Sequence, residues 1–230
     1  MPVFSLVTAA MLALLVSLGV WQVHRLHWKL GLIAEVNRSL TLPPVSLDAA
    51  LKLGKRAEYR RVTLAGRFDH AKEAYVHGIA EGAEVWHVVT PFITDDGRVL
   101  LVDRGIVPDA LRDPATRRAG QVAGERRVTG VWRTPDPPGL FTPPPDLARR
   151  LWYSHDVASI AAADHIKPAA PVMLEADAAP NPGGWPKGGQ TVVAFRNEHL
   201  QYAITWFGLA AALIGVWLAY HISKGRLSWR

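Results

Sequence analysis

The chain has 230 residues, a formal net charge of +6, 49 % hydrophobic residues and no cysteine. This length allows one or two domains, and a mean hydropathy of only +0.07 excludes a multi-span transporter. The absence of cysteine excludes disulfides, thiolate copper sites and covalently attached c-type haem. The basic charge suits an anionic lipid surface, and we expect no nucleic-acid partner.

A first long apolar run extends from Val3 to about Val23 without a charged residue. A helix needs about 20 such residues to cross the hydrocarbon core of a bilayer. A cleaved signal peptide is the alternative, but no basic residue precedes the run and no A-x-A pattern ends it. We therefore predict that residues 1–23 form an uncleaved transmembrane helix.

The same helix is expected to continue beyond the membrane. Trp21, Arg25 and Trp28 recur at helical spacing on one face, which extends the helix to about Asn37. A Thr-Leu-Pro-Pro sequence follows and ends it, because proline disfavours helix at and before its own position. Residues 24–58 are thus predicted to be a helical extension and a linker.

Strand patterns dominate the middle of the chain. The Asp95–Asp96–Gly97 turn between two apolar runs is a strong hairpin signal, whereas the proline-rich stretch from Pro135 to Pro145 predicts a loop. The predicted strands are residues 61–68, 73–77, 84–93, 98–105, 125–132, 152–154 and 171–175, with a short helix at 156–165. The predicted fold class is an α+β membrane protein, in which two transmembrane helices flank an antiparallel β-rich extramembrane domain at 59–196.

A second apolar run, from Leu200 to Tyr220, contains no Asp, Glu, Lys or Arg and predicts a transmembrane helix at 197–222. The tail at 223–230 is short and basic, and short basic tails stay in the cytoplasm. Both ends of this multi-pass chain would then be cytoplasmic, with the β-rich domain in the periplasm, outside the inner membrane of a bacterium. Arg25 and Lys29 oppose this orientation, because they place positive charge on the outer face.

His199 lies where a polar segment enters the second apolar run, at the membrane surface. An ionisable ring at this depth is a candidate for a functional site. The residues leave two interpretations open: a hydrogen bond to Glu198 or a backbone carbonyl, and axial ligation of a haem iron by neutral imidazole. His24 lies at the same end of the first run; it could share an iron or copper ion with His199, but two unrelated interfacial imidazoles are the favoured interpretation. His221 lies at the opposite membrane face.

Two arginines and three aromatic residues accompany this histidine. Arg25 and Arg196 offer the paired donors that suit haem propionates, although they equally suit lipid phosphate as ordinary anchors. Trp21, Tyr202 and Trp206 fit an aromatic belt at the membrane surface. They would form the walls of a pocket only if they cluster around the histidine.

The remaining polar residues give no second site from the sequence. Asp103–Arg104–Gly105 is interpreted as a strand-end turn with a local ion pair. Five histidines are taken as ordinary because they are scattered without metal-ligand spacing: His70, His77, His87, His155 and His165. There is no nucleophile elbow, phosphate loop or zincin motif, so we predict no enzymatic activity.

Several blocks of sequence resemble a known family. The outermost blocks are Val20–Lys29 and Arg196–Trp206, and those between them are Tyr59–Val62, Gly66–Phe68, Thr90–Phe92, Leu101–Pro108 and Gly188–Thr191. Their order and spacing are similar to those of the Surfeit-locus (Shy-type) cytochrome c oxidase assembly factors, over nearly the whole chain. The sequence departs from the family at Ile106, where tryptophan is frequent, and at 84–87, before the following strand.

The resemblance implies an assembly factor that binds haem a non-covalently and transiently and helps insert it into the catalytic subunit of an aa3-type oxidase. The implied partners are that subunit, haem a synthase and membrane lipid. The histidine proposed as haem ligand in the family corresponds to His199. The other expected cofactor-binding residues are Arg25, Arg196, Trp21, Tyr202 and Trp206.

Two alternatives remain beside this expectation. One is a haem-free membrane scaffold that stabilises the oxidase core during assembly, with the aromatic residues as helix–helix contacts. The other is an electron-transferring oxidoreductase, which would need a second strong axial ligand. The lack of cysteine and the single well-placed histidine count against the second alternative.

Overall fold

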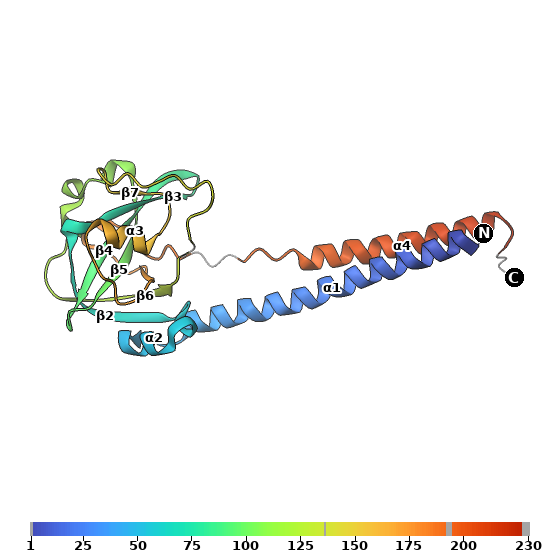
Figure 1. Cartoon of the computed structure of the whole chain (residues 1–230), viewed down its shortest axis with the longest axis horizontal. Helices are drawn as coiled ribbons and strands as arrows, with labels where there is room; N and C mark the ends of the chain where they lie inside the picture. The colour runs from blue at the N-terminus through green and yellow to red at the C-terminus, as the bar shows by residue number, and fades with distance from the viewer. Residues whose placement is uncertain (1, 136, 192–194, 227–230) are drawn as a thin grey trace. The chain divides into compact units, whose positions relative to one another are not determined.

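The computed structural model describes residues 2–135, 137–191 and 195–226 and divides the chain into two compact units (Figure 1). The helical unit combines Met1–Asn37 with Ala194–Arg230, and the β-rich unit is Arg38–Val193. Apolar helices near the two ends of the sequence thus flank a β-rich domain, which confirms the predicted fold class. Residues 192–194, before the second helix, and 227–230 of the predicted basic tail lie outside the described residues.

The helical unit is a pair of long helices, α1 (Pro2–Thr41) and α4 (His199–Ser223). Each contains a stretch long and apolar enough to cross a membrane. They run antiparallel and side by side, with the start of α1 and the end of α4 at the same end of the pair (Figure 1). The predicted continuation of the first helix is confirmed, and α1 extends past the expected end at Asn37.

A stripe of buried and half-buried residues runs along each helix where the two pack. Its members recur at alternating intervals of three and four residues, the spacing of two helices that interlock along their length. On α1 they are Ser5, Thr8, Leu12, Leu15, Gly19, Gln22 and Leu26. On α4 they are His199, Ala203, Trp206, Ala210, Leu213 and Trp217. Contacts from Ser5 to Trp217 and from Gln22 to His199 confirm that the stripes face each other.

The β-rich unit contains β1 (Val45–Ser46), β2 (Arg61–Phe68), β3 (Ala74–Ala80), β4 (Ala83–Thr94), β5 (Val99–Pro108), β6 (Arg126–Arg133), β7 (Leu151–Trp152) and β8 (Met173–Ala176). The strand order is β1-β2-β6-β8-β5-β4-β3-β7, and an additional β2–β4 pairing closes β2, β6, β8, β5 and β4 into a ring. Most pairs are antiparallel as predicted, but β1–β2, β3–β7 and β5–β8 are parallel.

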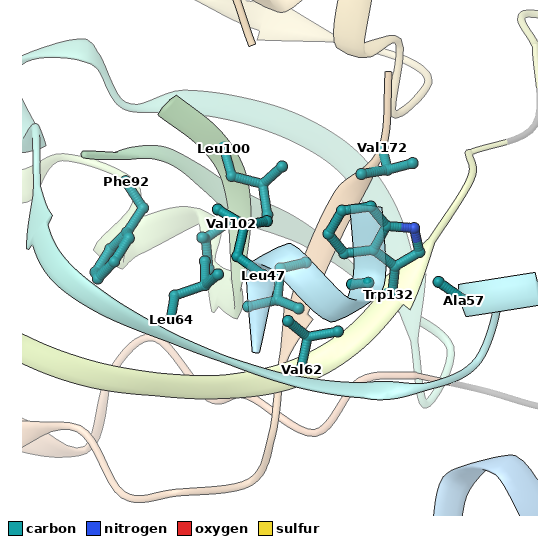
Figure 2. Packing of buried hydrophobic residues seen from close by; sticks show 11 residues of the cluster. Leu47, Ala57, Val62, Leu64, Phe92, Leu100, Val102, Trp132 and Val172 are labelled. Carbon is teal, nitrogen blue, oxygen red and sulfur yellow. The ribbon is translucent and has the colours of Figure 1, made fainter. Parts of the chain in front are cut away.

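The main core lies inside this ring of strands. Helix α2 (Leu47–Leu53) begins at Ser46, whose side chain accepts a hydrogen bond from the Ala49 amide, and contributes Leu47 to the core. Trp132 and Phe92 are its largest members, and Figure 2 shows both among aliphatic side chains from neighbouring strands. A smaller cluster packs α3 (Val157–Ala163) against β3, β4 and β5.

The Asp103–Arg104–Gly105 segment differs from its prediction as a strand-end turn. It lies inside β5, where a bulge separates the His87–Ile106 pair from the Val89–Asp103 pair. Gly105 has a φ of +107° there, and its backbone lies directly against the Lys187 carbonyl. Arg104 makes no local ion pair; instead it reaches Glu73, which precedes β3.

Glu73 is the centre of a buried polar network. Its carboxylate accepts hydrogen bonds from Arg104 (3.0 Å) and Arg117 (2.6 Å), and also from Gln121 (2.9 Å) and Tyr75 (3.2 Å). Glu73, Arg104 and Arg117 are each exposed by 5 % or less. Burial alone would raise the pKa of Glu73, but hydrogen bonding to His70 and Arg117 outweighs it and lowers the pKa to about 2.

This low pKa predicts acid sensitivity. A carboxyl group whose pKa falls on folding stabilises the fold above its unfolded-state value of 4.5, and the contribution disappears as the pH drops through about 2. The shift corresponds to about 3 kcal/mol at neutral pH. We expect the free energy of unfolding of wild type and of a Glu73→Gln variant to converge from pH 5 toward pH 2, measured by denaturant titration in detergent. A constant difference between them would contradict this assignment.

Candidate functional site

The candidate site lies where the N-terminus of α4 meets α1. Nδ1 of His199 is 2.7 Å from Oε1 of Gln22, and the two side chains face each other at stripe positions. Gln22 is only 8 % exposed, so this polar contact is enclosed by the two helices. His199 therefore bonds to Gln22 and not to Glu198, one of its predicted partners. Glu198 instead pairs with Arg196 at 2.6 Å.

This hydrogen bond determines what the imidazole can do. The amide oxygen of Gln22 is an acceptor, so Nδ1 of His199 must carry the hydrogen. A neutral imidazole protonated at Nδ1 keeps its lone pair on Nε2. Within the described residues, Nε2 makes no hydrogen bond. His199 therefore presents a free, oriented ring nitrogen, the arrangement found in metal-ligating histidines whose other nitrogen is held by a second residue.

Three of the predicted site residues lie on one side of this histidine. Trp21 and Arg25 flank the contact stripe of α1, and Tyr202 flanks that of α4. Because the helices run antiparallel, the helical repeat places these flanks on the same side of the pair. Trp21 is 53 % exposed and Tyr202 is 49 % exposed. An open aromatic surface therefore adjoins His199.

The other predicted residues occupy different surroundings. Trp206 is half-buried within the α4 stripe, one helical step beyond Tyr202. The guanidinium of Arg25 lies 4.3 Å from the centre of the Trp28 ring, a cation–π contact. Arg196 is exposed, and its hydrogen bond to Glu198 raises the pKa of Arg196. Among the described residues, neither arginine forms a buried ion pair.

The suggested pairing of His24 with His199 is wrong. His24 follows Gln22 by two residues, which turns it to the opposite face of α1, and it is exposed. His221 stacks near Trp217, Phe4 and Tyr220 at the other end of the helix pair, as its sequence position predicts. His199 is thus the one histidine of these three placed at the candidate site.

Two features were missed from the sequence. Gln22 lies within the first of the family-like blocks and was not predicted as a site residue, although a lone amide in an apolar run is itself a signal for a buried polar partner. The histidines taken as scattered include a pair, His87 and His155, that the fold brings to one carboxylate of Asp103. No local spacing could reveal that cluster, because its members come from three separate segments.

Comparison with known proteins shows to which family the chain belongs. A family model described as the SURF1 family matches residues 9–211. The chain belongs to the SURF1 family. The match includes most of α1, about the first half of α4 and the whole β-rich unit between them, so family membership covers the candidate site as well as the fold.

Curated relatives agree with this assignment. "Surfeit locus protein 1" of Homo sapiens is 40 % identical over 217 residues, which cover 87 % of this chain and 71 % of the relative. The proteins of the same name from Mus musculus and Xenopus tropicalis are 39 % and 37 % identical, and each alignment covers 90 % of this chain and 72 % of the relative. The resemblance inferred from the motifs is therefore confirmed.

Proposed function

We propose that this SURF1-family chain is an assembly factor for an aa3-type cytochrome c oxidase, which holds haem a and passes it to the catalytic subunit. It acts by binding and transfer, without catalytic turnover. The two long helices anchor it in the inner membrane of a bacterium, with the domain at 59–196 in the periplasm and the tail at 223–230 in the cytoplasm. Haem a synthase is the proposed donor of the haem.

The observation that carries the proposal is the free Nε2 of His199. The hydrogen bond to Gln22 fixes the tautomer and the ring orientation, so the lone pair is available to a haem iron as a proximal ligand. Gln22 is a neutral acceptor, which makes the imidazole a less basic ligand than a carboxylate partner would. Such a ligand is suited to a carrier, which must release its cargo when the oxidase subunit binds it more strongly.

The surroundings also suit haem a. The porphyrin ring and the isoprenoid tail are apolar and can lie in hydrocarbon along the exposed surface with Trp21 and Tyr202. The two propionates are anionic and can reach Arg25 on α1 or Arg196 just before α4. The exposed position of both arginines leaves their donors accessible. Trp206 lies at the helix–helix contact and supports this aromatic surface from between the two helices.

The test compares haem retention in three purified proteins. Wild type, His199→Ala and His24→Ala are each co-expressed with the enzymes that make haem a, purified in detergent and examined by reduced-minus-oxidised optical spectra. We expect a haem a band in wild type and in His24→Ala and its loss in His199→Ala. His24→Ala is the matched control, because it removes an imidazole from the same membrane level on the opposite face of α1.

A Gln22→Leu variant separates orientation from ligation. It leaves His199 in place and removes only the acceptor for Nδ1, so we expect haem affinity about 10- to 100-fold weaker. Full retention of haem by folded His199→Ala would contradict the ligand assignment. If no protein holds haem while oxidase assembly still depends on the chain, the haem-free scaffold is the better function.

A further inference from the structure

A cluster of metal-ligating side chains lies in the β-rich unit, in the part of the chain unrelated to the helix site. It consists of His87 on β4, Asp103 on β5 and His155, which precedes α3. One ligand atom from each of these residues lies within 4.8 Å of the others. The Asp103 side chain is 4 % exposed, and those of His87 and His155 are 19 % and 31 % exposed. The cluster is thus enclosed on the carboxylate side and accessible on the imidazole side.

Both imidazoles approach the same carboxylate oxygen. Nδ1 of His87 is 2.8 Å from Oδ2 of Asp103, and Nε2 of His155 is 3.4 Å from it. The other oxygen, Oδ1, accepts a hydrogen bond from the Gly105 amide at 2.8 Å. This second contact fixes the carboxylate plane, so that Oδ2 remains directed at the two rings.

Hydrogen bonding accounts for only one of the two imidazoles. The bond from His87 to Asp103 is well formed. Nε2 of His155 is buried and has no aligned hydrogen-bond partner in the described chain, although it lies close to the carboxylate. A buried ring nitrogen without a partner loses its hydrogen bond to water and gains none from the protein, which costs free energy. A cation between the two rings and the carboxylate would engage all three groups.

The two distances to Asp103 are close to those of a divalent transition-metal site, and the two ring nitrogens lie within 4.8 Å of each other. Tetrahedral Zn²⁺ has bonds of about 2.0–2.2 Å to histidine nitrogen and carboxylate oxygen, which places its ligand atoms roughly 3.4 Å apart. The His155–Asp103 separation of 3.4 Å already matches. The shorter His87–Asp103 contact needs to open by roughly 0.6 Å, which is possible once the bridging proton leaves Nδ1 of His87 and the metal ion takes its place.

One side of the cluster stays open for a fourth ligand. His155 lines a pocket of about 270 Å³ together with Glu175, Arg133 and Ser154. Glu175 on β8 is in register with Asp103 on β5, so both side chains point to the same face of the sheet. Water or the Glu175 carboxylate can therefore complete the coordination from the pocket.

We propose that His87, Asp103 and His155 form a binding site for one divalent transition metal ion, with Zn²⁺ as the ion that best fits two imidazoles and a carboxylate. The bound ion ties β4 and β5 to the segment that leads into α3. It keeps one coordination position facing the pocket beside Glu175. This site is separate from the His199 site and does not depend on haem binding.

The test is Zn²⁺ titration by calorimetry into the full chain in detergent, after a chelator has been used and removed. Wild type is compared with His155→Gln and with His165→Asn, which alters an exposed histidine just beyond α3. We expect one saturable site in wild type and in His165→Asn. His155→Gln should bind at least about 100-fold more weakly, since loss even of an outer partner of a metal ligand costs 10- to 100-fold.

A second measurement keeps the result interpretable if a variant folds poorly. Cu²⁺ added to wild type in place of Zn²⁺ should give an electron paramagnetic resonance spectrum with coupling to two imidazole nitrogens. A His199→Ala variant should give the same spectrum, because its histidine is not part of this site. The proposal is overturned if wild type shows no saturable Zn²⁺ binding, or if folded His155→Gln binds Zn²⁺ as tightly as wild type.

Discussion

Glu73→Gln is expected to lower the free energy of unfolding of the β-rich unit by about 3–5 kcal/mol, a large part of the stability of an ordinary domain. The substitution keeps the size of the side chain but leaves Arg104 and Arg117 buried without a counter-charge. Burial already lowers the pKa of Arg104 to about 10 with Glu73 ionised beside it. Without that carboxylate, the free-energy cost of desolvating two guanidinium groups is no longer offset.

The measurement is denaturant unfolding at neutral pH, followed by tryptophan fluorescence, with Glu125→Gln as the matched control. Glu125 is an exposed glutamate just before β6 and makes no ion pair among the described residues. It should change the stability by less than about 0.5 kcal/mol. If the two variants are equally stable, the buried network contributes little and the fold depends on its apolar cores alone.

Gly105→Ala is expected to have the second large effect. A methyl group at this position would lie 1.9 Å from the Lys187 carbonyl oxygen and 2.2 Å from its carbon, both of them backbone atoms. The φ of +107° adds strain of about 1–3 kcal/mol for any residue with a side chain. The bridge between Ile106 and Lys187 would have to open, so we expect a loss of 3 kcal/mol or more, about the sum of strain and overpacking.

Gly82→Ala separates strain from steric conflict. Gly82 has a φ of +80° in the turn between β3 and β4, with nothing within 4 Å of the added methyl group. It should show only the cost of the backbone conformation, about 1–2 kcal/mol. The two melting temperatures, measured in parallel, give the contribution of the β5–Lys187 contact by difference. Equal losses would mean that β5 tolerates the methyl group by shifting away from Lys187.

The strands could be predicted well because their residues carry the signal locally. β2 (Arg61–Phe68) alternates between buried and half-exposed side chains along its length, as a strand with one covered face must. The hairpin of β4 and β5 follows from the turn at Asp95–Asp96–Gly97. The ring closure between β2 and β4 could not be predicted, because it depends on the curvature of strands far apart in the sequence.

The helix contact was not predictable by the usual periodicity. In an apolar run every face of a helix is hydrophobic, so hydrophobicity no longer distinguishes the buried side. Residue size does not distinguish it either: Gly19, Ala203 and Ala210 lie in the contact stripe, but Gly208 and Gly215 lie outside it. The face of α1 on which Trp21 and Arg25 recur is not the contact stripe but lies beside it.

The sequence predicted His199 as a candidate ligand, but it did not predict the orientation of the imidazole ring. The site needs Gln22, which lies 177 residues away along the chain, and only the packed helices bring the two together. The cluster of His87, Asp103 and His155 likewise depends on contacts between residues far apart in the sequence. Its geometry depends on the bulge at Gly105, which shifts the register of β4 against β5. No local sequence pattern predicts this bulge.

The hydrogen bond between Gln22 and His199 also bears on how the protein is made. In the proposed membrane setting, the two helices insert at different times, because the whole β-rich domain is synthesised between them, and they must then pair in lipid. Apolar stripes alone can slide past one another by whole turns with little change in energy. A single buried polar pair forbids that slippage, because every other alignment leaves an amide and an imidazole unsatisfied in hydrocarbon. The same contact that orients the imidazole thus sets the alignment of the finished helix pair.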